Sequence, residues 1–151
     1  MRRNLLFVFL LMAITAVAGF GQTDADREAI KRAALDYAES YYEGNGDKME
    51  AALSPDLAKR IANTNAQGRS SLGHMSAMTL VQIIRTGGGK STPKAEQQKD
   101  VTILDVMVNS ATVKLEMRDW VDYMHIAKMN GKWVIVNVLW EGKPKKDEKK
   151  N

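Results

Sequence analysis

The sequence predicts an α+β fold, in which helices of the first half cover an antiparallel sheet formed by the second half. From Asp100 to Glu141 the chain alternates apolar and polar residues in runs separated by short turns, which is typical of a β-meander. Most of the chain before Asp100 instead shows apolar residues at helical spacing. A bent sheet needs such helices as a cover for one of its faces.

The first 21 residues have the pattern of a secretory signal peptide. Arg2 and Arg3 form a basic start, residues 5–17 form an apolar run, and small residues follow. A membrane anchor, the alternative, would need about 20 apolar residues. The absence of cysteine excludes disulfides and a lipid-modified cysteine. We therefore expect a periplasmic or secreted bacterial protein without stable membrane insertion after the signal is removed.

The formal net charge of +4 belongs to the two ends of the chain. Arg2 and Arg3 contribute +2, and residues 143–151 contribute +3, because five lysines outnumber two acids there. The body between the ends is nearly neutral, so it lacks the basic face that nucleic-acid binding requires. We expect residues 22–142 to form one domain and residues 143–151 to form a lysine-rich disordered tail.

A long amphipathic helix is expected from Thr23 to Tyr42. Thr23 and Asp26 have the spacing of a capping box. The Gly44-Asn45-Gly46 sequence ends the helix. The apolar stripe on one side of this helix consists of Ile30, Ala33, Ala34, Tyr37, Ala38 and Tyr41.

Two short helices are expected next. The first starts at Asp47 and runs through Leu53. The second starts at Ser54, because a serine N-cap followed by proline and an acid is typical of a helix N-terminus. Leu57 and Ile61 would be the buried side of this second helix.

A polar segment and a last helix lead to the sheet. Residues 63–75 are weakly patterned, which predicts a loop or a small edge hairpin. Ser76 is expected to cap a helix that the glycines at 87–89 end. The run from Gly87 to Ser91 ends like a phosphate-binding loop, but Ile84 replaces the required first glycine. We interpret the run as a helix stop followed by a loop.

The Asn130-Gly131 dipeptide predicts a type I′ turn, because both positions of this turn need positive φ. The turn sets the register of the last two strands, in which the predicted partners are Met129 and Lys132, Ile126 and Ile135, Met124 and Asn137, and Asp122 and Leu139. A two-residue turn at Arg118-Asp119 would place Leu115 opposite Asp122 and Val113 opposite Met124. A three-residue turn would reverse the faces.

This register assigns residues to the two faces of the sheet. The predicted inner face carries Asp122, Met124, Ile126, Trp133, Ile135, Asn137 and Leu139. The predicted outer face carries Tyr123, His125, Val134, Val136, Val138 and Trp140. The outer face would be too apolar to stand in water, so we expect a homodimer through it.

Asp122 and Asn137 are the most informative candidates for a site, because polar groups on an apolar face must be paired, hydrated or used. A buried acid with a raised pKa can transfer protons. It can equally be structural, for instance paired with Arg118 or Arg60. His74 and His125 are isolated in the sequence, so no metal site is expected.

Several short segments, in this order, resemble the nuclear-transport-factor-2-like superfamily. They are Tyr41-Tyr42-Glu43-Gly44 before Asp47, Leu53-Ser54-Pro55-Asp56-Leu57-Ala58-Lys59-Arg60, Val121-Asp122-Tyr123, Gly131-Lys132-Trp133 and Ile135-Val136-Asn137. More narrowly, the chain resembles the exported bacterial branch labelled "putative lumazine-binding", over about residues 26–141. Ser54 stands where this branch leads us to expect histidine.

The resemblance implies a cone-shaped fold with a pocket between the first helix and the concave sheet, and often a dimer through the outer face. Members of the superfamily include ketosteroid isomerase, scytalone dehydratase and proteins that only bind. We expect non-catalytic binding of a small apolar or aromatic ligand, without a cofactor, by Tyr37, Tyr41, Asp122, Met124, Trp133 and Asn137. The alternative is a cofactor-independent isomerase or dehydratase that uses Asp122 and Tyr41.

Overall fold

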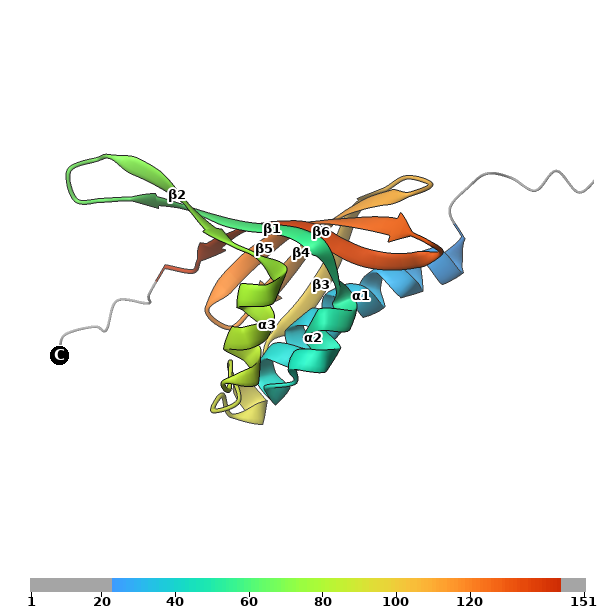
Figure 1. Cartoon of the computed structure of the whole chain (residues 1–151), viewed down its shortest axis with the longest axis horizontal. Coiled ribbons are helices and arrows are strands. Elements are labelled where there is room, and N and C mark those ends of the chain that lie inside the picture. The colour runs from blue at the N-terminus through green and yellow to red at the C-terminus, as the bar shows by residue number, and fades with distance from the viewer. Residues whose placement is uncertain (1–22, 145–151) are drawn as a thin grey trace, which may run out of the picture.

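The computed structural model describes residues 23–144, which form three helices and a six-stranded sheet (Figure 1). The helices are α1 (Asp24–Glu43), α2 (Gly46–Ala52) and α3 (Ala77–Arg85), with a 3₁₀ turn, η1, at Lys94–Glu96. The strands are β1 (Leu53–Thr64), β2 (Ser70–Met75), β3 (Lys99–Val106), β4 (Ser110–Met117), β5 (Trp120–Met129) and β6 (Lys132–Gly142). The expected signal peptide and most of the expected tail lie outside the described residues.

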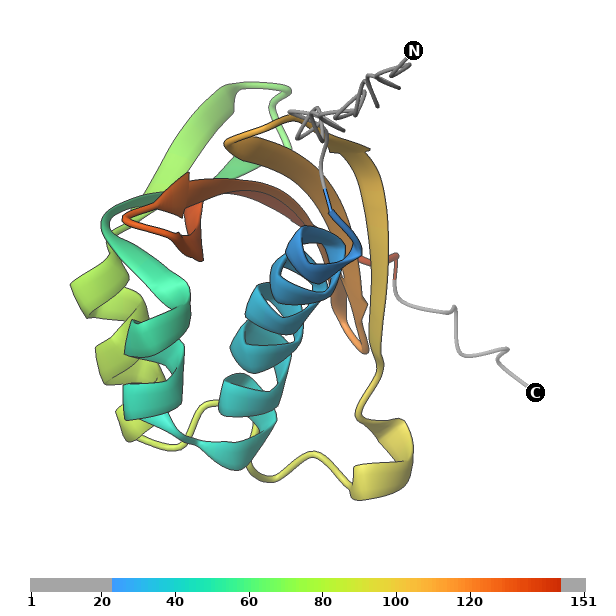
Figure 2. The same ribbon diagram turned by 90° about the vertical axis from the view of Figure 1, so that its right-hand side faces the viewer.

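The sheet curves around α1, with α2 and α3 beside that helix (Figure 2). Its strand order is β2-β1-β6-β5-β4-β3. β1 and β6 are parallel, and every other neighbouring pair is antiparallel. This is the α+β arrangement that the sequence predicts. No helix among residues 23–144 is both long and apolar enough to cross a membrane.

The predicted helix signals are confirmed at both ends of the helical half. The side chains and backbones of Thr23 and Asp26 form a capping box at α1. Gly44 ends α1 with φ 66°, a left-handed conformation that glycine adopts without strain. The Ser76 side chain accepts a hydrogen bond from the Thr79 amide and caps α3.

The predicted helix at Ser54 is wrong, because this segment is the start of β1. The register of β1 against β6 shifts between Leu53 and Ala58, so Pro55 lies where the ladder is irregular and its missing N–H is tolerated. Leu57 is buried as expected, but in the sheet. The expected edge hairpin in residues 63–75 is present and joins β1 to β2.

Both predicted turns of the meander are confirmed. Asn130 and Gly131 have φ values of 51° and 80°, as a type I′ turn requires. Met129 pairs with Lys132, and Ile126 pairs with Ile135. Arg118 and Asp119 form the two-residue connection from β4 to β5, so Leu115 faces Asp122 and Val113 faces Met124.

A β-bulge in β6 overturns the predicted register beyond Ile135. His125 pairs with Asn137 although Ile126 pairs with Ile135, which leaves Val136 as an extra residue. Beyond it Met124 pairs with Val138 instead of Asn137, and Asp122 pairs with Trp140 instead of Leu139. One extra residue reverses every later side chain.

The bulge also changes the composition of the two faces. Val138 and Trp140 belong to the inner face, where Val138 is buried and Trp140 packs against the core. Asn137 and Leu139 lie on the outer face, and Leu139 is 53% exposed beside Tyr123, which is 48% exposed. The outer face is therefore less apolar than predicted.

Candidate functional site

A buried ion pair between Lys59 and Asp122 is the centre of the candidate site. The Lys59 Nζ lies 2.6 Å from Asp122 Oδ1. Lys59 extends from β1 and Asp122 from β5, on the face that the helices cover. Their side chains are 6% and 0% exposed. Burial of two charges is costly unless each also has further partners.

Tyr37 and Trp120 supply those partners. The Lys59 Nζ donates a hydrogen bond to the Tyr37 hydroxyl at 2.8 Å. The Trp120 indole N–H donates to Asp122 Oδ2 at 2.8 Å, so both carboxylate oxygens are engaged. The ammonium also lies 5.0 Å from the centre of the Trp140 ring, within cation–π range. The pair is therefore held by three aromatic side chains, which come from α1, β5 and β6.

Burial shifts the pKa values of this cluster toward its neutral forms. It raises the pKa of Asp122, and the attraction of Lys59 with the hydrogen bond from Trp120 offsets only part of this rise. It lowers the pKa of Lys59, which the Asp122 carboxylate likewise offsets in part. The pKa of Tyr37 lies well above its usual value, because of burial and the charge of Asp122. Transfer of a proton from the Lys59 ammonium to the Asp122 carboxylate therefore costs less free energy here than in water.

An apolar cavity of about 150 Å³ adjoins this cluster. Its lining comes from all three helices and from four strands: Tyr37, Tyr41, Met49, Lys59, Met75, Leu80, Ile83, Ile84, Trp120 and Trp140. Ile83 is 41% exposed, and Tyr41, Met75, Trp120 and Trp140 are only partly buried. The cavity is therefore reachable from solvent, and Lys59 is the one charged residue in the part of its lining that residues 23–144 form.

The triple-glycine loop fixes one wall of this cavity. The Gly89 amide donates to the Tyr41 carbonyl at 2.9 Å. A Cβ atom on Gly89 would lie 2.0 Å from the Tyr41 ring, so only glycine allows the loop this close. The Tyr41 ring in turn packs edge-on against Trp120, with ring centres 4.9 Å apart. The loop that ends α3 thus helps to position an aromatic wall.

Three of the predicted site residues meet here. Tyr37 and Tyr41 line the cavity, and Asp122 binds Lys59 beside it. Tyr37, and not Tyr41, has the hydroxyl that contacts Lys59. The partner of Asp122 is Lys59 instead of Arg60 or Arg118. Arg118 pairs with Asp119 and Glu96 on the surface.

The other three predicted residues lie elsewhere. Met124 is fully buried in the hydrophobic core. The Trp133 indole donates to Asp26 at 2.9 Å and ties β6 to the start of α1. Asn137, predicted on the inner face, lies on the outer face with its amide 3.5 Å from His125 Nδ1, because of the bulge.

Sequence reasoning missed Lys59, Trp120 and Trp140. Lys59 was assigned to a helix, and Trp140 to the outer face. One signal could have found Lys59. Leu57, Lys59 and Ile61 alternate along the chain, which in a strand places a single charge on an apolar face.

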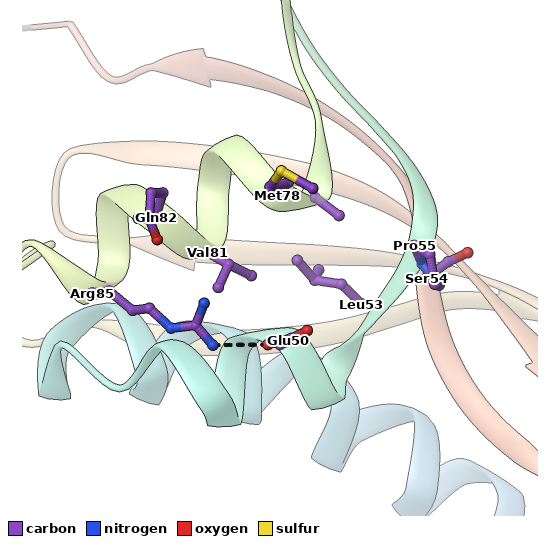
Figure 3. A pocket seen from close by; sticks show the side chains of 9 residues that line it. Glu50, Leu53, Ser54, Pro55, Met78, Val81, Gln82 and Arg85 are labelled. Atoms are coloured by element: carbon purple, nitrogen blue, oxygen red, sulfur yellow. Dashed lines mark hydrogen bonds and ion pairs between the residues drawn. The ribbon is translucent and has the colours of Figure 1, made fainter.

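A larger cavity of about 520 Å³ lies between α3, the end of α2 and the start of β1 (Figure 3). Its charged residues, Glu50 and Arg85, pair with each other at 2.9 Å and are 66% and 46% exposed. Water screens the charges of side chains that are this exposed. The smaller cavity beside Lys59 is the better candidate site for that reason. In residues 23–144 no cluster of three or more acidic or histidine side chains could hold a metal ion.

The curved sheet, its helical cover and the cavity between them define a nuclear-transport-factor-2-like domain. The sequence profile of the family described as "Putative lumazine-binding" matches residues 25–141. This match spans most of the chain, and the chain belongs to that family. No curated protein matches the chain.

Solved structures show the same fold at low sequence identity. An NTF2-like protein of unknown function from Shewanella baltica has a TM-score of 0.61 and 17% identity, covering 82% of this chain and 99% of its own. One from Methylobacillus flagellatus has a TM-score of 0.62 and 19% identity, covering 82% and 97%. A "putative scytalone dehydratase" from Novosphingobium aromaticivorans has a TM-score of 0.51 and 14% identity, covering 79% and 85%.

Proposed function

We propose that the protein binds a small aromatic molecule, without chemical turnover, in the cavity beside Lys59. The observation that carries this proposal is an apolar, solvent-reachable cavity with Lys59 on its wall, where Lys59 pairs with the fully buried Asp122. Such a site buries an apolar body and directs one polar group of the ligand toward the charge pair. The family description supports a flat, heteroaromatic ligand class.

The size of the cavity limits the ligand. An apolar cavity of about 150 Å³ accommodates one aromatic ring. A fused two-ring compound such as lumazine requires the partly exposed rim, which includes Ile83 and Met75, to move apart. Single-ring ligands should therefore bind without rearrangement, and lumazine should bind only with a shift of α3.

Nuclear magnetic resonance of the three indole N–H groups tests this proposal. Phenol and lumazine are the probes. Binding should shift the Trp120 and Trp140 signals, because both residues line the cavity. Trp133 does not line it and donates a hydrogen bond to Asp26, so its signal serves as the internal control. Shifts of all three signals alike, or of none at millimolar probe, would overturn the proposal.

A matched pair of α3 variants locates the binding site. Ile83→Trp places a large ring at the rim of the cavity and should abolish the Trp120 shift. Met78→Trp makes the same substitution on the same helix, at a side chain that is 82% exposed and does not line this cavity, and should leave binding unchanged. Equal effects of the two variants would place the ligand elsewhere.

A second candidate function is an isomerase or dehydratase that transfers protons through Asp122. The raised pKa of this buried carboxyl favours it, and one structure of similar fold is described as a putative scytalone dehydratase. In this reading the Tyr41 hydroxyl stabilises the developing oxyanion. Hydrogen–deuterium exchange next to the carbonyl of a cyclic ketone probe is the readout. Asp122→Asn should slow it by about 10²–10⁴-fold, and exchange at the uncatalysed rate in the wild type would reject this function.

Export to the periplasm or the medium is also proposed, from the basic start and the apolar run of the first 21 residues. N-terminal sequencing of the protein from its native host is the test. A mature chain that begins near residue 22 is expected. A chain that begins at Met1 in the cytoplasm would contradict it.

Self-association through the outer sheet face is a further proposal. The bulge in β6 means that this face includes Leu139 in place of Val138 and Trp140. Tyr123 and Leu139 pair across β5 and β6 and are both about half exposed, so they form the apolar centre of the face. Sedimentation at micromolar concentration should give two chains for the wild type. Leu139→Asp should give one chain, and a monomeric wild type would reject the dimer.

A further inference from the structure

We propose that Lys59 forms a reversible imine with small aromatic aldehydes that enter the cavity. This inference rests on the proposed binding function, because it uses the same cavity. It goes further in assigning a covalent reaction to one named amine. Three observations carry it: the location of Lys59, the acid–base partner beside it, and the shape and polarity of the space in front of it.

The first observation is that the Lys59 amine is part of the cavity wall. The side chain lines the cavity, although only 6% of it is exposed. Its Nζ lies 5.4 Å from the centre of the Tyr37 ring and 5.0 Å from the centre of the Trp140 ring. An aromatic aldehyde that stacks in this cavity would bring its carbonyl carbon toward the amine. Surface lysines, in contrast, are hydrated ammonium groups without a binding site for an aldehyde.

The second observation is the proton acceptor. An ammonium group is no nucleophile, so Lys59 must lose a proton before it attacks. Asp122 Oδ1, at 2.6 Å, is in place to take that proton. Burial lowers the pKa of Lys59 and raises that of Asp122, so the transfer costs less here than in water.

The third observation is the cavity itself, which is apolar and holds about one aromatic ring. Its apolar lining offers few hydrogen-bond partners to the water that would reverse imine formation. The Tyr37 hydroxyl, 2.8 Å from Lys59 Nζ, can pass a proton to the carbonyl oxygen as negative charge develops there. An aliphatic acid or a phosphate ester would not suit this lining.

The reaction balances without an external reagent. Lys59 gives one proton to Asp122, and its lone pair forms the N–C bond to the carbonyl carbon while the C=O π electrons move to oxygen. A second nitrogen proton moves to that oxygen through the Tyr37 hydroxyl. Asp122 then returns its proton to the resulting hydroxyl group, which leaves as water while the nitrogen lone pair forms the C=N bond. The product is a protonated imine beside the Asp122 carboxylate, so the buried ion pair is retained.

Trapping with borohydride tests the proposal on the folded wild-type chain. Benzaldehyde is the probe, sodium borohydride reduces any imine to a stable benzyl amine, and peptide mass spectrometry locates it. We expect Lys59 to be modified faster than any other lysine, because the cavity holds the aldehyde beside its amine. Modification of surface lysines only, or of all lysines at one rate, would overturn the proposal.

Two arginine variants serve as matched controls. Lys94→Arg removes an exposed lysine of η1 and should leave the modification of Lys59 unchanged. Lys59→Arg keeps a cation for Asp122 but removes the amine, and it should remove the fast modification. If Lys59→Arg does not fold, the peptide map of the wild type still decides the question.

Phenol, which has no carbonyl group, separates this inference from the proposed function. Phenol binding together with a benzyl group on Lys59 supports both. Phenol binding without modification of Lys59 overturns the imine and leaves the binding function. If phenol does not bind and Lys59 is not modified, both the imine and the binding function are overturned.

Discussion

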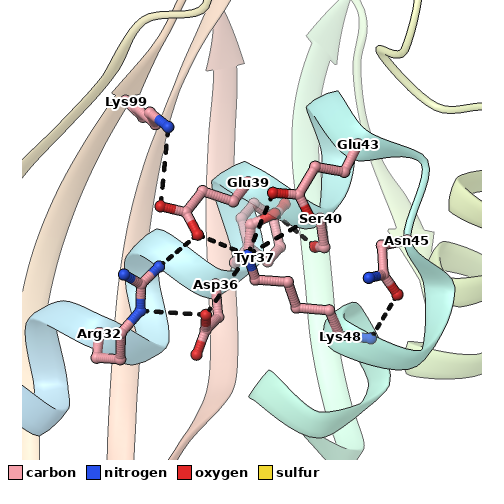
Figure 4. A network of polar contacts seen from close by, with 9 residues as sticks. All are labelled: Arg32, Asp36, Tyr37, Glu39, Ser40, Glu43, Asn45, Lys48 and Lys99. Atoms are coloured by element: carbon pink, nitrogen blue, oxygen red, sulfur yellow. Dashed lines mark hydrogen bonds and ion pairs between the residues drawn. The ribbon is translucent and has the colours of Figure 1, made fainter.

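Two lysine–carboxylate pairs with equal N–O distances differ in burial and in the direction of their pKa shifts. Lys48 contacts Glu39 at 2.6 Å in a surface network that also contains Arg32, Asp36, Glu43 and Lys99 (Figure 4). Lys59 contacts Asp122 at the same distance beneath the helices. The surface pair is 25% and 20% exposed, whereas the buried pair is 6% and 0% exposed.

The pKa shifts of the two pairs have opposite signs. Burial is the largest single effect on the pKa of Glu39 and raises it, but the hydrogen bonds and charges of Lys48 and Arg32 together outweigh burial and lower the pKa to about 2. Burial also lowers the pKa of Lys48, and the surrounding acids more than compensate, so the pKa is raised. In the buried pair the effect of burial wins on both partners. Exposure to solvent, and not the N–O distance, therefore decides whether the pKa shifts favour the charged forms or ease proton transfer within the pair.

The largest expected difference comes from removing each lysine. Lys59→Met leaves Asp122 buried without its cation and should cost about 3–5 kcal/mol of unfolding free energy. Lys48→Met should cost at most about 1 kcal/mol, because Glu39 keeps Arg32 and remains hydrated. Urea unfolding measures both values. Equal losses would mean that burial does not distinguish the pairs.

A smaller difference is expected from neutralising each acid without changing its shape. Asp122→Asn removes a charge-assisted hydrogen bond to Lys59 and should cost about 1.5–3 kcal/mol. Glu39→Gln should cost at most about 1 kcal/mol. Thermal melting of the two variants beside the wild type gives the comparison. An unchanged melt of Asp122→Asn would reject a structural role for the buried carboxylate.

Trp120→Phe examines the second partner of Asp122. It keeps an aromatic ring against Tyr41 but leaves Asp122 Oδ2 without its indole donor, which should cost about 1 kcal/mol. Trp140→Phe is the control, since its indole makes no hydrogen bond within residues 23–144. A larger loss for Trp140→Phe would show that ring volume, and not the hydrogen bond, is what stabilises this wall.

The smallest effect is expected in the acid dependence of stability. Glu39 has a lowered pKa, so its contribution is present above about 4.5 and is lost as the pH falls toward about 2. Asp122 has a raised pKa, so its shift favours folding most at low pH. This contribution is lost as the pH rises through the pKa that Asp122 has in the folded state. Glu39→Gln should flatten the acid loss between pH 4.5 and 2, while Asp122→Asn should not. A steeper loss in Glu39→Gln would contradict the assignment.

Local signals made most of the fold predictable. The Asn130-Gly131 turn and the two-residue turn at Arg118 fixed the register close to each turn, because turn geometry depends on the residues in it. The caps of α1 and α3 were equally visible, since each uses a side chain next to the helix end it satisfies. The residues within and next to these elements are sufficient to predict them.

The errors fell where distant contacts decide the outcome. Ser54 and Pro55 have a local preference for a helix start, but β6 pairs with Leu53 before them and with Ala58 after them, which makes this segment part of a strand. Val136 has no sequence mark of a bulge, yet it reverses Asn137 and Trp140. Tyr37, Tyr41 and Asp122 were found because their faces follow from local periodicity. Lys59 was missed because its segment was assigned to a helix, and only the pairing of β1 with β6 makes it a strand.

Titration of the carboxyl carbons of Asp122 and Glu39 in one nuclear magnetic resonance sample tests the central claim most directly. The claim is that burial turns the Lys59–Asp122 pair into a site of easy proton exchange. It predicts that Asp122 titrates above the usual aspartate value of 3.8 and Glu39 near 2. If Asp122 titrated below 3.8, as Glu39 does relative to its own usual value, the buried pair would be a locked ion pair and the claim would be wrong.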